Sequence, residues 1–286
     1  MRLWHDDDAR PFAEYILRVG NGEEPPVRGN GAVVSFGGAS PSAGVEIALY
    51  AGITRCETLE ALINKVYPSL PLRFAEQGCV DGRAILTTKN AAVNQLNDTI
   101  AALIPGEEHV YLSADSVAAD DDQAVVYGAE FLNTITVAGM PPHRLALKIR
   151  ISVILLRDLD AGTGLFKETR LIVRRLGRRV IVAKIAGGSH TGEWVHIPRI
   201  TMSSTGQRWP FTLMQRKFPL QLAFAMTINK SQGQTIETVG IHLSEPVLTH
   251  GQLYGALSRA SRVSGVALHF PNGESTTNVV YWGMLQ

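Results

Sequence analysis

Apolar residues recur along the chain as short runs that alternate with helical faces. Four short runs predict strands, at residues 84–87, 220–227, 239–243 and 266–270. Two helices are predicted among them, one over 251–261 and one with an inner face made by Val93, Leu96, Ile100 and Leu103. Strands that alternate with helices in this way predict the parallel sheet of an α/β domain.

Two more helices are predicted nearer the N-terminus. In the first, Phe12, Ile16 and Val19 share one face, and a Pro and a Gly flank it. The second covers Thr54–Pro68, with inward positions at Leu59, Leu62, Ile63 and Val66. Residues 21–45, which separate them, are rich in Gly, Pro and Ser and predict a surface segment.

The pattern of apolar and polar residues changes between residues 145 and 200. Short apolar runs there are divided by Gly or by charged turns, as in TRLIVRRLG and RRVIVAKIAG. Several short strands at such spacing predict a small β-barrel. The simplest architecture is therefore an α/β layer interrupted by an inserted barrel.

Composition limits the classes of partner. Lys and Arg number 27 against 26 for Asp and Glu, so bulk charge gives no argument for a nucleic-acid partner, which would need a local basic patch. Cys56 and Cys79 fit no metal-ligand spacing and predict a reducing compartment. Because no apolar run approaches the roughly 20 residues that span a bilayer, we expect a soluble, intracellular chain that has no membrane partner.

A polar loop follows the strand predicted at 220–227. In TINKSQGQT, Thr227, Asn229, Lys230 and Ser231 can donate to phosphate oxygens, and Gly233 lets the backbone approach a ligand. Ligands also collect at this edge of an α/β sheet. The loop therefore predicts a polyanion site, and the alternative is a turn in which Ser231 only caps a helix.

The segment HGQLYGALSRASR, at 250–262, strengthens the first interpretation. As a helix it brings Gln252 and Arg259 to one face and turns Leu253 and Leu257 inward. An arginine near a phosphate-binding loop can meet the charge that develops on a transferred phosphoryl group. The alternative is a surface arginine paired with a carboxylate.

Together these two segments resemble motifs V and VI of superfamily-one helicases, most closely the Pif-one (petite integration frequency) ATP-dependent DNA helicases and their Helitron-associated relatives. The residues that carry the resemblance are FPLQLAFAMTINKSQGQT, 218–235, and HGQLYGALSR, 250–259. Upstream, FAEYILRVGNG resembles the segment after motif III, RAILTTKNAAVNQLN the motif IV region, and EFLNTITVAGMPPHRLALKI with VILLRDLD the family's small inserted domain. The resemblance is weakest from 21 to 50.

The resemblance implies the C-terminal RecA-like lobe of an ATP-driven helicase that moves five-prime to three-prime on single-stranded DNA, with an inserted Src-homology-three-like small β-barrel and a partly irregular helical N-terminal segment. Its implied domains are 1–75, a remnant of the first motor lobe; 76–128 with 214–286, the second lobe; and 129–213, the barrel. It also implies a place in DNA repair, recombination and telomere maintenance, in the nucleus or the mitochondrion.

The resemblance assigns site residues as well. The residues implied to contact DNA are Thr227, Asn229, Lys230 and Ser231. Gln232 and Gly233 would face the ATP phosphates, and Arg259 would be the arginine finger. Arg83 is a candidate for a second phosphate contact, with a solvated turn residue as the alternative.

The sequence lacks parts that the implied chemistry needs. Neither a Walker A loop, which cradles phosphates, nor a Walker B carboxylate, which holds Mg²⁺, is present. ATP and Mg²⁺ are thus expected in the complete family enzyme and not as tight ligands of this chain alone. The expected partners are single-stranded DNA and a Walker-motif-bearing N-terminal lobe.

Several positions depart from the family pattern. Arg150 stands at a usual Gly, and Lys167 and Glu168 stand in a turn where relatives carry Asn and Gly; positive φ there would strain them. Gly255 replaces a usual Val, and Asn229 stands where many relatives have His.

Two other functions stay open at this level. One is a non-enzymatic nucleic-acid-binding module or a degenerate transposon-derived fragment, which the missing Walker motifs favour. The other is a metabolic α/β enzyme, which lacks a candidate nucleophile or metal cluster because the histidines are scattered; no metal site is predicted. Trp194 and Trp209 could meet DNA bases or simply pack, and Tyr254 and Phe224 could be core residues.

Overall fold

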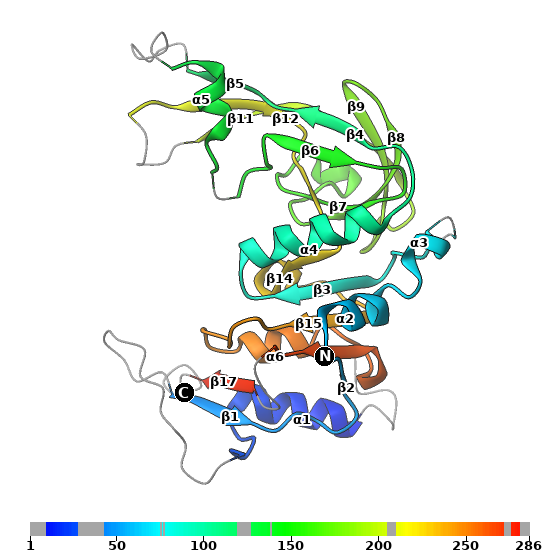
Figure 1. Cartoon of the computed structure of the whole chain (residues 1–286), viewed down its shortest axis with the longest axis vertical. Helices are drawn as coiled ribbons and strands as arrows, with labels where there is room; N and C mark the ends of the chain where they lie inside the picture. The colour runs from blue at the N-terminus through cyan, green and yellow to red at the C-terminus, as the bar shows by residue number, and fades with distance from the viewer. Residues whose placement is uncertain are drawn as a thin grey trace. The chain divides into compact units, whose positions relative to one another are not determined.

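The chain forms two compact units. The computed structural model describes residues 10–27, 43–74, 76, 78–118, 127–137, 139–204, 210–271 and 276–280. One unit, here called the parallel-sheet unit, comprises residues 1–104 and 224–286, and the other, the inserted unit, comprises 105–223 (Figure 1). Trp209 and most of the surface segment predicted over 21–45 lie outside the described residues.

The parallel-sheet unit is built on a five-stranded sheet in the order β14-β3-β15-β16-β2. Its strands, all paired in parallel, are β2 (Thr54–Arg55), β3 (Arg83–Thr87), β14 (Ala225–Thr227), β15 (Thr238–His242) and β16 (Val266–His269). The predicted α/β fold with a parallel sheet is confirmed. Because every strand runs in the same direction, one edge of the sheet collects all the carboxyl ends.

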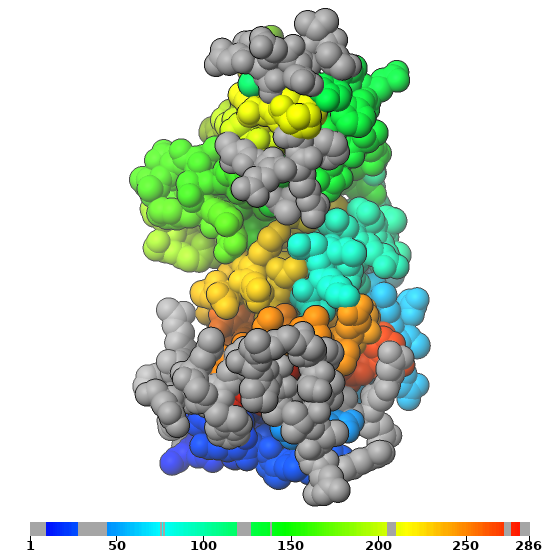
Figure 2. Space-filling model, turned by 90° about the vertical axis from the view of Figure 1, so that its left-hand side faces the viewer, coloured from blue at the N-terminus to red at the C-terminus, as the bar shows by residue number. Residues whose placement is uncertain are grey.

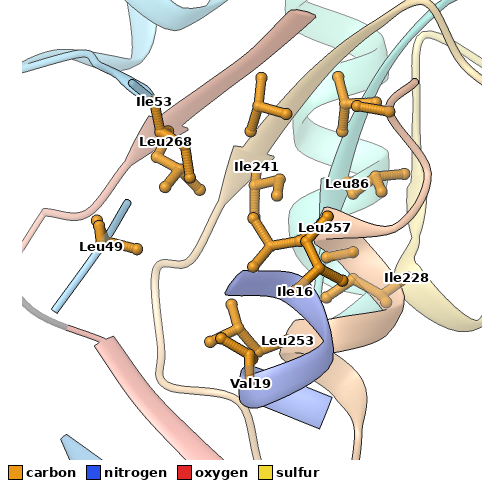
Figure 3. Packing of buried hydrophobic residues seen from close by; sticks show 14 of the residues in the cluster. Ile16, Val19, Leu49, Ile53, Leu86, Ile228, Ile241, Leu253, Leu257 and Leu268 are labelled. Carbon is orange, nitrogen blue, oxygen red and sulfur yellow. The ribbon is translucent and has the colours of Figure 1, made fainter. Parts of the chain in front are cut away.

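Helices cover both faces of this sheet. On one face, α2 (Leu59–Val66) packs so closely that a Cβ on Gly240 of β15 would come within 2.7 Å of Val66 Cγ2. The other face is covered by α1 (Arg10–Asn21) and α6 (Gln252–Leu257). Figure 3 shows Ile16 and Val19 from α1 meeting Leu253 and Leu257 from α6, next to strand residues that include Ile241. Burial of this kind contributes roughly 1.5–3 kcal/mol per large aliphatic side chain.

The long helix α4 (Asn90–Leu103) joins α2 on its face of the sheet and packs on β14 and β3. The predicted inward residues Val93, Leu96 and Ile100 are buried, whereas Leu103 is 43% exposed. At 1.5 Å per residue the helix is about 21 Å long, against about 16 Å for a five-residue strand. Its last turn therefore extends past the apolar surface that it was expected to cover.

The predicted helix over Thr54–Pro68 is shorter than expected. Thr54 and Arg55 belong to β2, and α2 starts at Leu59 with Thr58 as its N-cap, whose Oγ1 accepts a hydrogen bond from Ala61 N at 3.1 Å. Thr54 is instead paired with Ala267 of β16, which keeps it out of the helix.

The single strand predicted over 220–227 is in fact two. Leu220–Leu222 form β13, which pairs antiparallel with β7 (Ser152–Leu155) in the inserted unit, and β14 begins three residues later in the parallel sheet. An apolar run predicts a buried strand, but it does not indicate which other strand this strand pairs with. The two segments of this run consequently fall in different units.

The inserted unit is an antiparallel β domain, as predicted. Its strands form three sheets, in the orders β10-β9-β8-β7-β13, β11-β12-β5 and β4-β6. The further strands are β4 (His109–Leu112), β5 (Ala114–Val117), β6 (Arg144–Leu147), β8 (Arg170–Leu176), β9 (Val180–Ile185), β10 (Trp194–Pro198), β11 (Ile200–Ser204) and β12 (Leu213–Lys217). The unit starts before the predicted boundary at 129, since β4 pairs with β6 and β5 with β12.

Shorter elements complete the two units. In the parallel-sheet unit these are β1 (Ala43–Ile47), which pairs antiparallel with β17 (Thr276–Val280), the short helix α3 (Leu70–Arg73), and the 3-10 turns η4 (Ile228–Ser231) and η5 (Val263–Gly265). In the inserted unit they are α5 (Ala129–Thr134) and the 3-10 turn η3 (Ala161–Thr163).

Two of the departures from the family pattern occupy left-handed backbone. Arg150 has φ of 70° and Glu168 has φ of 72°. Only Gly adopts this region without steric strain, and another residue loses about 1–2 kcal/mol there. Strain in the turn that precedes β8 is therefore confirmed for Glu168, while Lys167 is not among the residues with positive φ.

Candidate phosphate-binding edge

The loop after β14 begins with a single 3-10 turn, η4. Asn229, Gln232 and Gly233 are exposed, and Lys230 is half-buried. Gly233 has φ of 79°, and no atom lies within 4 Å of the position that a Cβ would take. This part of the loop therefore presents its backbone to a ligand without steric hindrance.

Ser231 plays an internal role in the same loop. Its side chain is fully buried, and its Oγ donates to Ile228 O at 2.7 Å. This hydrogen bond lies within the 3-10 turn, so the hydroxyl group stabilises the conformation of the loop. Gln234 adds a second fastening, because its Nε2 donates to Lys230 O at 3.2 Å.

Arg259 follows α6 and reaches the same loop. Its Nη1 donates to Ser231 O at 3.3 Å and to Gln234 O at 3.5 Å. Its Nε donates to Gly255 O at 3.0 Å, and its Nη2 donates to Ser258 Oγ at 2.9 Å. Within the described residues Arg259 makes no ion pair, so the expected alternative of a surface arginine paired with a carboxylate does not hold.

These contacts join α6 to the loop. A guanidinium has five N–H donors, and the four hydrogen bonds leave one N–H of Nη2 to meet a ligand. The backbone carbonyls neutralise part of the charge without cancelling it, as a carboxylate would. The arginine is thus a fixed cation beside Lys230.

Arg83 does not lie near Arg259 and the loop after β14. It opens β3, where it pairs with Thr238 of β15, while Thr227 pairs with Thr87 at the other end of the same strand. Its Nη1 donates to Val66 O at 2.8 Å, at the end of α2. Arg83 therefore lies at the amino edge of the sheet, about 13 Å along the strand from the carboxyl edge.

The carboxyl edge carries a row of polar side chains that sequence reasoning missed. Thr227, Thr87, His242 and His269 are register partners on four adjacent strands. Paired residues of neighbouring strands point to the same face, and this face is the one covered by α2 and α4. In the structure each of these four strands ends in Thr or His, whereas two of the predicted strands ended one residue later, at Leu243 and Phe270.

The two histidines of the row form a buried pair. His242 Nδ1 and His269 Nδ1 lie 2.9 Å apart, so one ring donates and the other accepts. Burial, together with the facing ring of His269, lowers the pKa of His242 to about 4, so His242 is uncharged at neutral pH. Thr87 Oγ1, beside them in the row, is buried and has no hydrogen-bond partner among the described residues.

Asn97 of α4 anchors the strand that carries the loop. Its Oδ1 accepts from Ala225 N at 2.8 Å and its Nδ2 donates to Ala225 O at 3.0 Å. β14 is an edge strand, and the amide side chain takes the place of a further strand there. Figure 2 shows α4, in teal, against the amber residues around β14.

A serine, a histidine and an aspartate also meet in the inserted unit, but not as a hydrolase triad. Ser113 Oγ lies 2.6 Å from His143 Nδ1, and Asp115 Oδ2 lies 3.8 Å from the same nitrogen. A triad needs the serine and the carboxylate on opposite ring nitrogens. This arrangement gives no support to the metabolic-enzyme alternative.

The aromatic residues that were candidates for stacking on DNA bases are of two kinds, buried and exposed. Phe224 is fully buried in an edge-to-face contact with Tyr67, and Tyr254 packs over Gly20 of α1. Both are packing residues. Trp194, by contrast, is 63% exposed on β10.

Known proteins resemble the chain over much of its length. A family model described as the 2B domain of DNA helicase Pif1 matches residues 130–176. The ATP-dependent DNA helicase PIF1 of Homo sapiens is 31% identical over 184 residues, which are 63% of this chain and 26% of that protein. The Xenopus laevis protein of the same name is 31% identical over 188 residues, with the same coverage.

The chain is related to the Pif1 DNA helicases. It spans about a quarter (26%) of the length of these Pif1 relatives. Among solved structures, Pif1 from Candida albicans matches with a TM-score of 0.56 at 19% identity, over 96% of this chain and 56% of that one. Bacteroides Pif1 in complex with ADP-AlF3 and single-stranded DNA matches with a TM-score of 0.52 at 20% identity, over 85% and 56%. The Pif1 fold, a RecA-like lobe with an inserted small β domain, is shared. Within the described ranges no helix is long and apolar enough to cross a membrane.

Proposed function

We propose that the parallel-sheet unit is the second motor lobe of a Pif1-type DNA helicase. In this role it binds single-stranded DNA through the loop after β14 and supplies Arg259 to an ATP site that it completes with a lobe bearing Walker motifs. The five-prime to three-prime direction of movement is proposed from the family resemblance.

One observation carries the proposal. The guanidinium of Arg259 is held by the carbonyls of Ser231 and Gln234, which flank the exposed Gln232 and Gly233. A residue just after α6 and the loop after β14 therefore act as one rigid group. Such a group can stabilise a developing phosphate charge without reorganising when the reaction occurs.

The proposed DNA contacts differ in what they offer. Asn229 is exposed and Lys230 half-buried, so an amide and an ammonium group are available for phosphate oxygens. Thr227 is half-buried at the end of β14. Ser231 contributes through the shape of the turn, because its hydroxyl is already donated to Ile228 O.

The residues present fit part of a nucleotide site. Gly233, with open space around it, and the exposed Gln232 suit contact with ATP phosphates. No lysine-bearing phosphate cradle or magnesium-binding carboxylate accompanies them in the sequence. When bound, Mg²⁺ would neutralise phosphate charge, while this chain's own residues orient the phosphates and place one cation beside them.

A binding measurement tests the DNA-contacting loop. Lys230→Ala should weaken the binding of a labelled oligothymidylate several-fold and make it less salt-dependent, because one phosphate contact is lost. Lys65→Ala removes an exposed cation of α2 in the same unit and is the matched control. Equal binding by the Lys230→Ala variant and the unchanged chain would contradict the loop's assignment.

An activity measurement tests Arg259. The chain is joined to a Pif1 N-terminal lobe that carries both Walker motifs, and DNA-stimulated ATP hydrolysis is measured. Arg259→Ala should lower turnover by roughly 10³-fold or more, which is the effect of removing an arginine finger. Arg259→Lys, which keeps the charge but not the fork of donors, should recover little. Unchanged turnover in Arg259→Ala would refute the assignment.

A second candidate function is a nucleic-acid-binding module without enzymatic activity. The observation that favours it is strained backbone at Arg150 and Glu168, where the family pattern has Gly and a turn. Such strain persists where selection on the motor is relaxed. If the joined protein binds oligothymidylate but hydrolyses no ATP, this second function is the better one.

A further inference from the structure

The guanidinium of Arg259 donates to four acceptors within the described residues, and one of them is a side chain. Ser231 O, Gln234 O and Gly255 O are backbone carbonyls, which accept at 3.3, 3.5 and 3.0 Å. The fourth acceptor is the hydroxyl of Ser258, whose Oγ lies 2.9 Å from Nη2. Among these four acceptors, Ser258 Oγ is therefore the one that depends on the identity of a side chain.

The end of α6 determines how Ser258 uses its hydroxyl. Arg259 N donates to Ala256 O at 3.3 Å, and Gly255 O accepts from two side chains, Arg259 Nε and Ser258 Oγ. A hydroxyl has one proton, and the proton of Ser258 is donated to Gly255 O at 3.2 Å. Because a guanidinium cannot accept, the lone pairs of Ser258 Oγ receive the N–H of Nη2.

These contacts fix the direction of the donor that is left for a ligand. Nε–H and the nearer N–H of Nη2 lie along one edge of the guanidinium, and Gly255 O and Ser258 Oγ occupy that edge. Nη1 donates to the loop carbonyls. The second N–H of Nη2 remains, so Ser258 holds the nitrogen that carries the remaining donor.

A serine near the end of a helix often bonds the carbonyl three residues before it, which by itself only satisfies the helix end. The bond from Ser258 Oγ to Gly255 O is of this kind. The contact with Nη2 goes beyond it, because it joins the hydroxyl to the arginine. A merely structural role for Ser258 would not depend on Arg259.

We propose that Ser258 is a positioning residue for Arg259: its hydroxyl orients Nη2 so that the remaining N–H is directed to the γ-phosphate of a nucleoside triphosphate. The inference rests on the proposed function, which gives the arginine a phosphate to meet. A donor that is in place before the reaction stabilises the developing charge without reorganising. Without the hydroxyl the guanidinium can pivot on the loop carbonyls, and a misplacement of about 1 Å can lower a rate by about a hundredfold.

The first test uses the full chain joined to a Pif1 N-terminal lobe with both Walker motifs. Ser258→Ala should lower kcat of DNA-stimulated ATP hydrolysis by roughly tenfold to a hundredfold. It should leave KM for ATP and the affinity for oligothymidylate unchanged, because the contact acts on charge that develops in the transition state. Ser258→Thr keeps the hydroxyl and should restore most of the loss. Ser261→Ala, which removes an exposed hydroxyl three residues further on, is the matched control and should keep full turnover.

A double variant separates positioning from a structural role. Two residues that act as one unit have non-additive effects, so Ser258→Ala should cause no further loss in a protein that already carries Arg259→Ala. A further loss as large as that of the single variant would overturn the proposal. It would also be overturned if Ser258→Thr were no more active than Ser258→Ala.

The orientation of Nη2 can also be measured without a motor, by NMR of the ¹⁵N-labelled full chain. The two Nη2 protons, identified by their loss in Arg259→Ala, should give separate signals in the unchanged chain. They should merge in Ser258→Ala, because loss of the acceptor frees rotation about the bond from Cζ to Nη2. Signals that stay separate in Ser258→Ala would refute the positioning role.

The proposed function and the role of Ser258 fail in different ways. Full turnover in the joined Arg259→Ala protein refutes the proposed function. An inactive Arg259→Ala protein beside a fully active Ser258→Ala protein refutes the role of Ser258 alone.

Discussion

Cations serve the two units of this chain in different ways. In the parallel-sheet unit, Arg259 donates to two loop carbonyls, to Gly255 O and to a hydroxyl, and is a structural member before any ligand arrives. In the inserted unit, Arg178 and Arg179 extend from a hairpin tip without an ion pair in the described residues. A fixed arginine holds its donors in one orientation toward an anion. A solvated arginine can move to meet an anion, and its attraction to that anion is weakened more by salt.

The comparison predicts where substitution damages the fold. Asn97 and Arg259 of the parallel-sheet unit are bonded internally, so their removal should cost stability. The exposed arginines of the inserted unit's hairpin tip should leave stability almost unaltered when they are removed.

Asn97→Ala should have the largest effect on stability. It leaves the N–H and C=O of Ala225 without partners in a buried place, and each such group costs about 1–3 kcal/mol. We expect the free energy of unfolding to fall by about 3 kcal/mol in urea denaturation. Asp98→Ala, at an exposed position of the same helix, is the control and should change it by less than about 0.5 kcal/mol. A small effect of Asn97→Ala would show that β14 does not need its anchor.

Arg259→Ala comes next and tests the comparison directly. The loss of its hydrogen bonds to Ser231, Gln234 and Gly255 should lower the free energy of unfolding by about 2 kcal/mol. Arg178→Ala, at the hairpin tip, should lower it by less than about 0.5 kcal/mol. Equal values for the two arginines, measured by the same denaturation, would erase the distinction between the units.

Acidification should weaken the parallel-sheet unit through its histidine pair. The pKa of His242 is lowered from 6.5 to about 4, mainly by burial, so the unfolded chain binds a proton that the folded chain refuses. Stability is fully present above about pH 6.5 and falls as the pH drops toward about 4. Denaturation midpoints across this window measure the loss. His242→Gln should flatten the profile, and His196→Gln, at an exposed position of the inserted unit, should not.

Gly255→Ala should have the smallest effect, and it is favourable. A Cβ there would meet Ile228 Cγ2 at 3.5 Å, which is an ordinary contact, and Ala suits a helix better than Gly. The free energy of unfolding should rise by about 0.5–1 kcal/mol. Gly240→Ala is the opposite case, because its Cβ would meet Val66 Cγ2 at 2.7 Å and must destabilise. A loss of stability in Gly255→Ala would mean that the departure from Val at this position is required.

Sequence reasoning succeeded where period and ligand chemistry are local. The strands at β3, β15 and β16, the inward face of α4 up to Ile100, and the proximity of Arg259 to the lysine-bearing loop all follow from spacing. Sequence reasoning failed where the structure depends on pairing between strands that are far apart in the sequence. The division of 220–227 between two sheets and the register that aligns Thr87 with His242 are products of strand pairing, which no local pattern encodes.

The two junctions of the inserted unit have a consequence for how such a chain can be rebuilt. The chain leaves the parallel-sheet unit after α4 and returns just before β14, so 105–223 interrupt a helix-to-strand connection and no strand of the parallel sheet. Every parallel pair, and the grip of Asn97 on Ala225, is encoded outside the interruption. The β domain can therefore be replaced by a short turn or by another domain, and the strand order and pairing of the parallel sheet should stay the same.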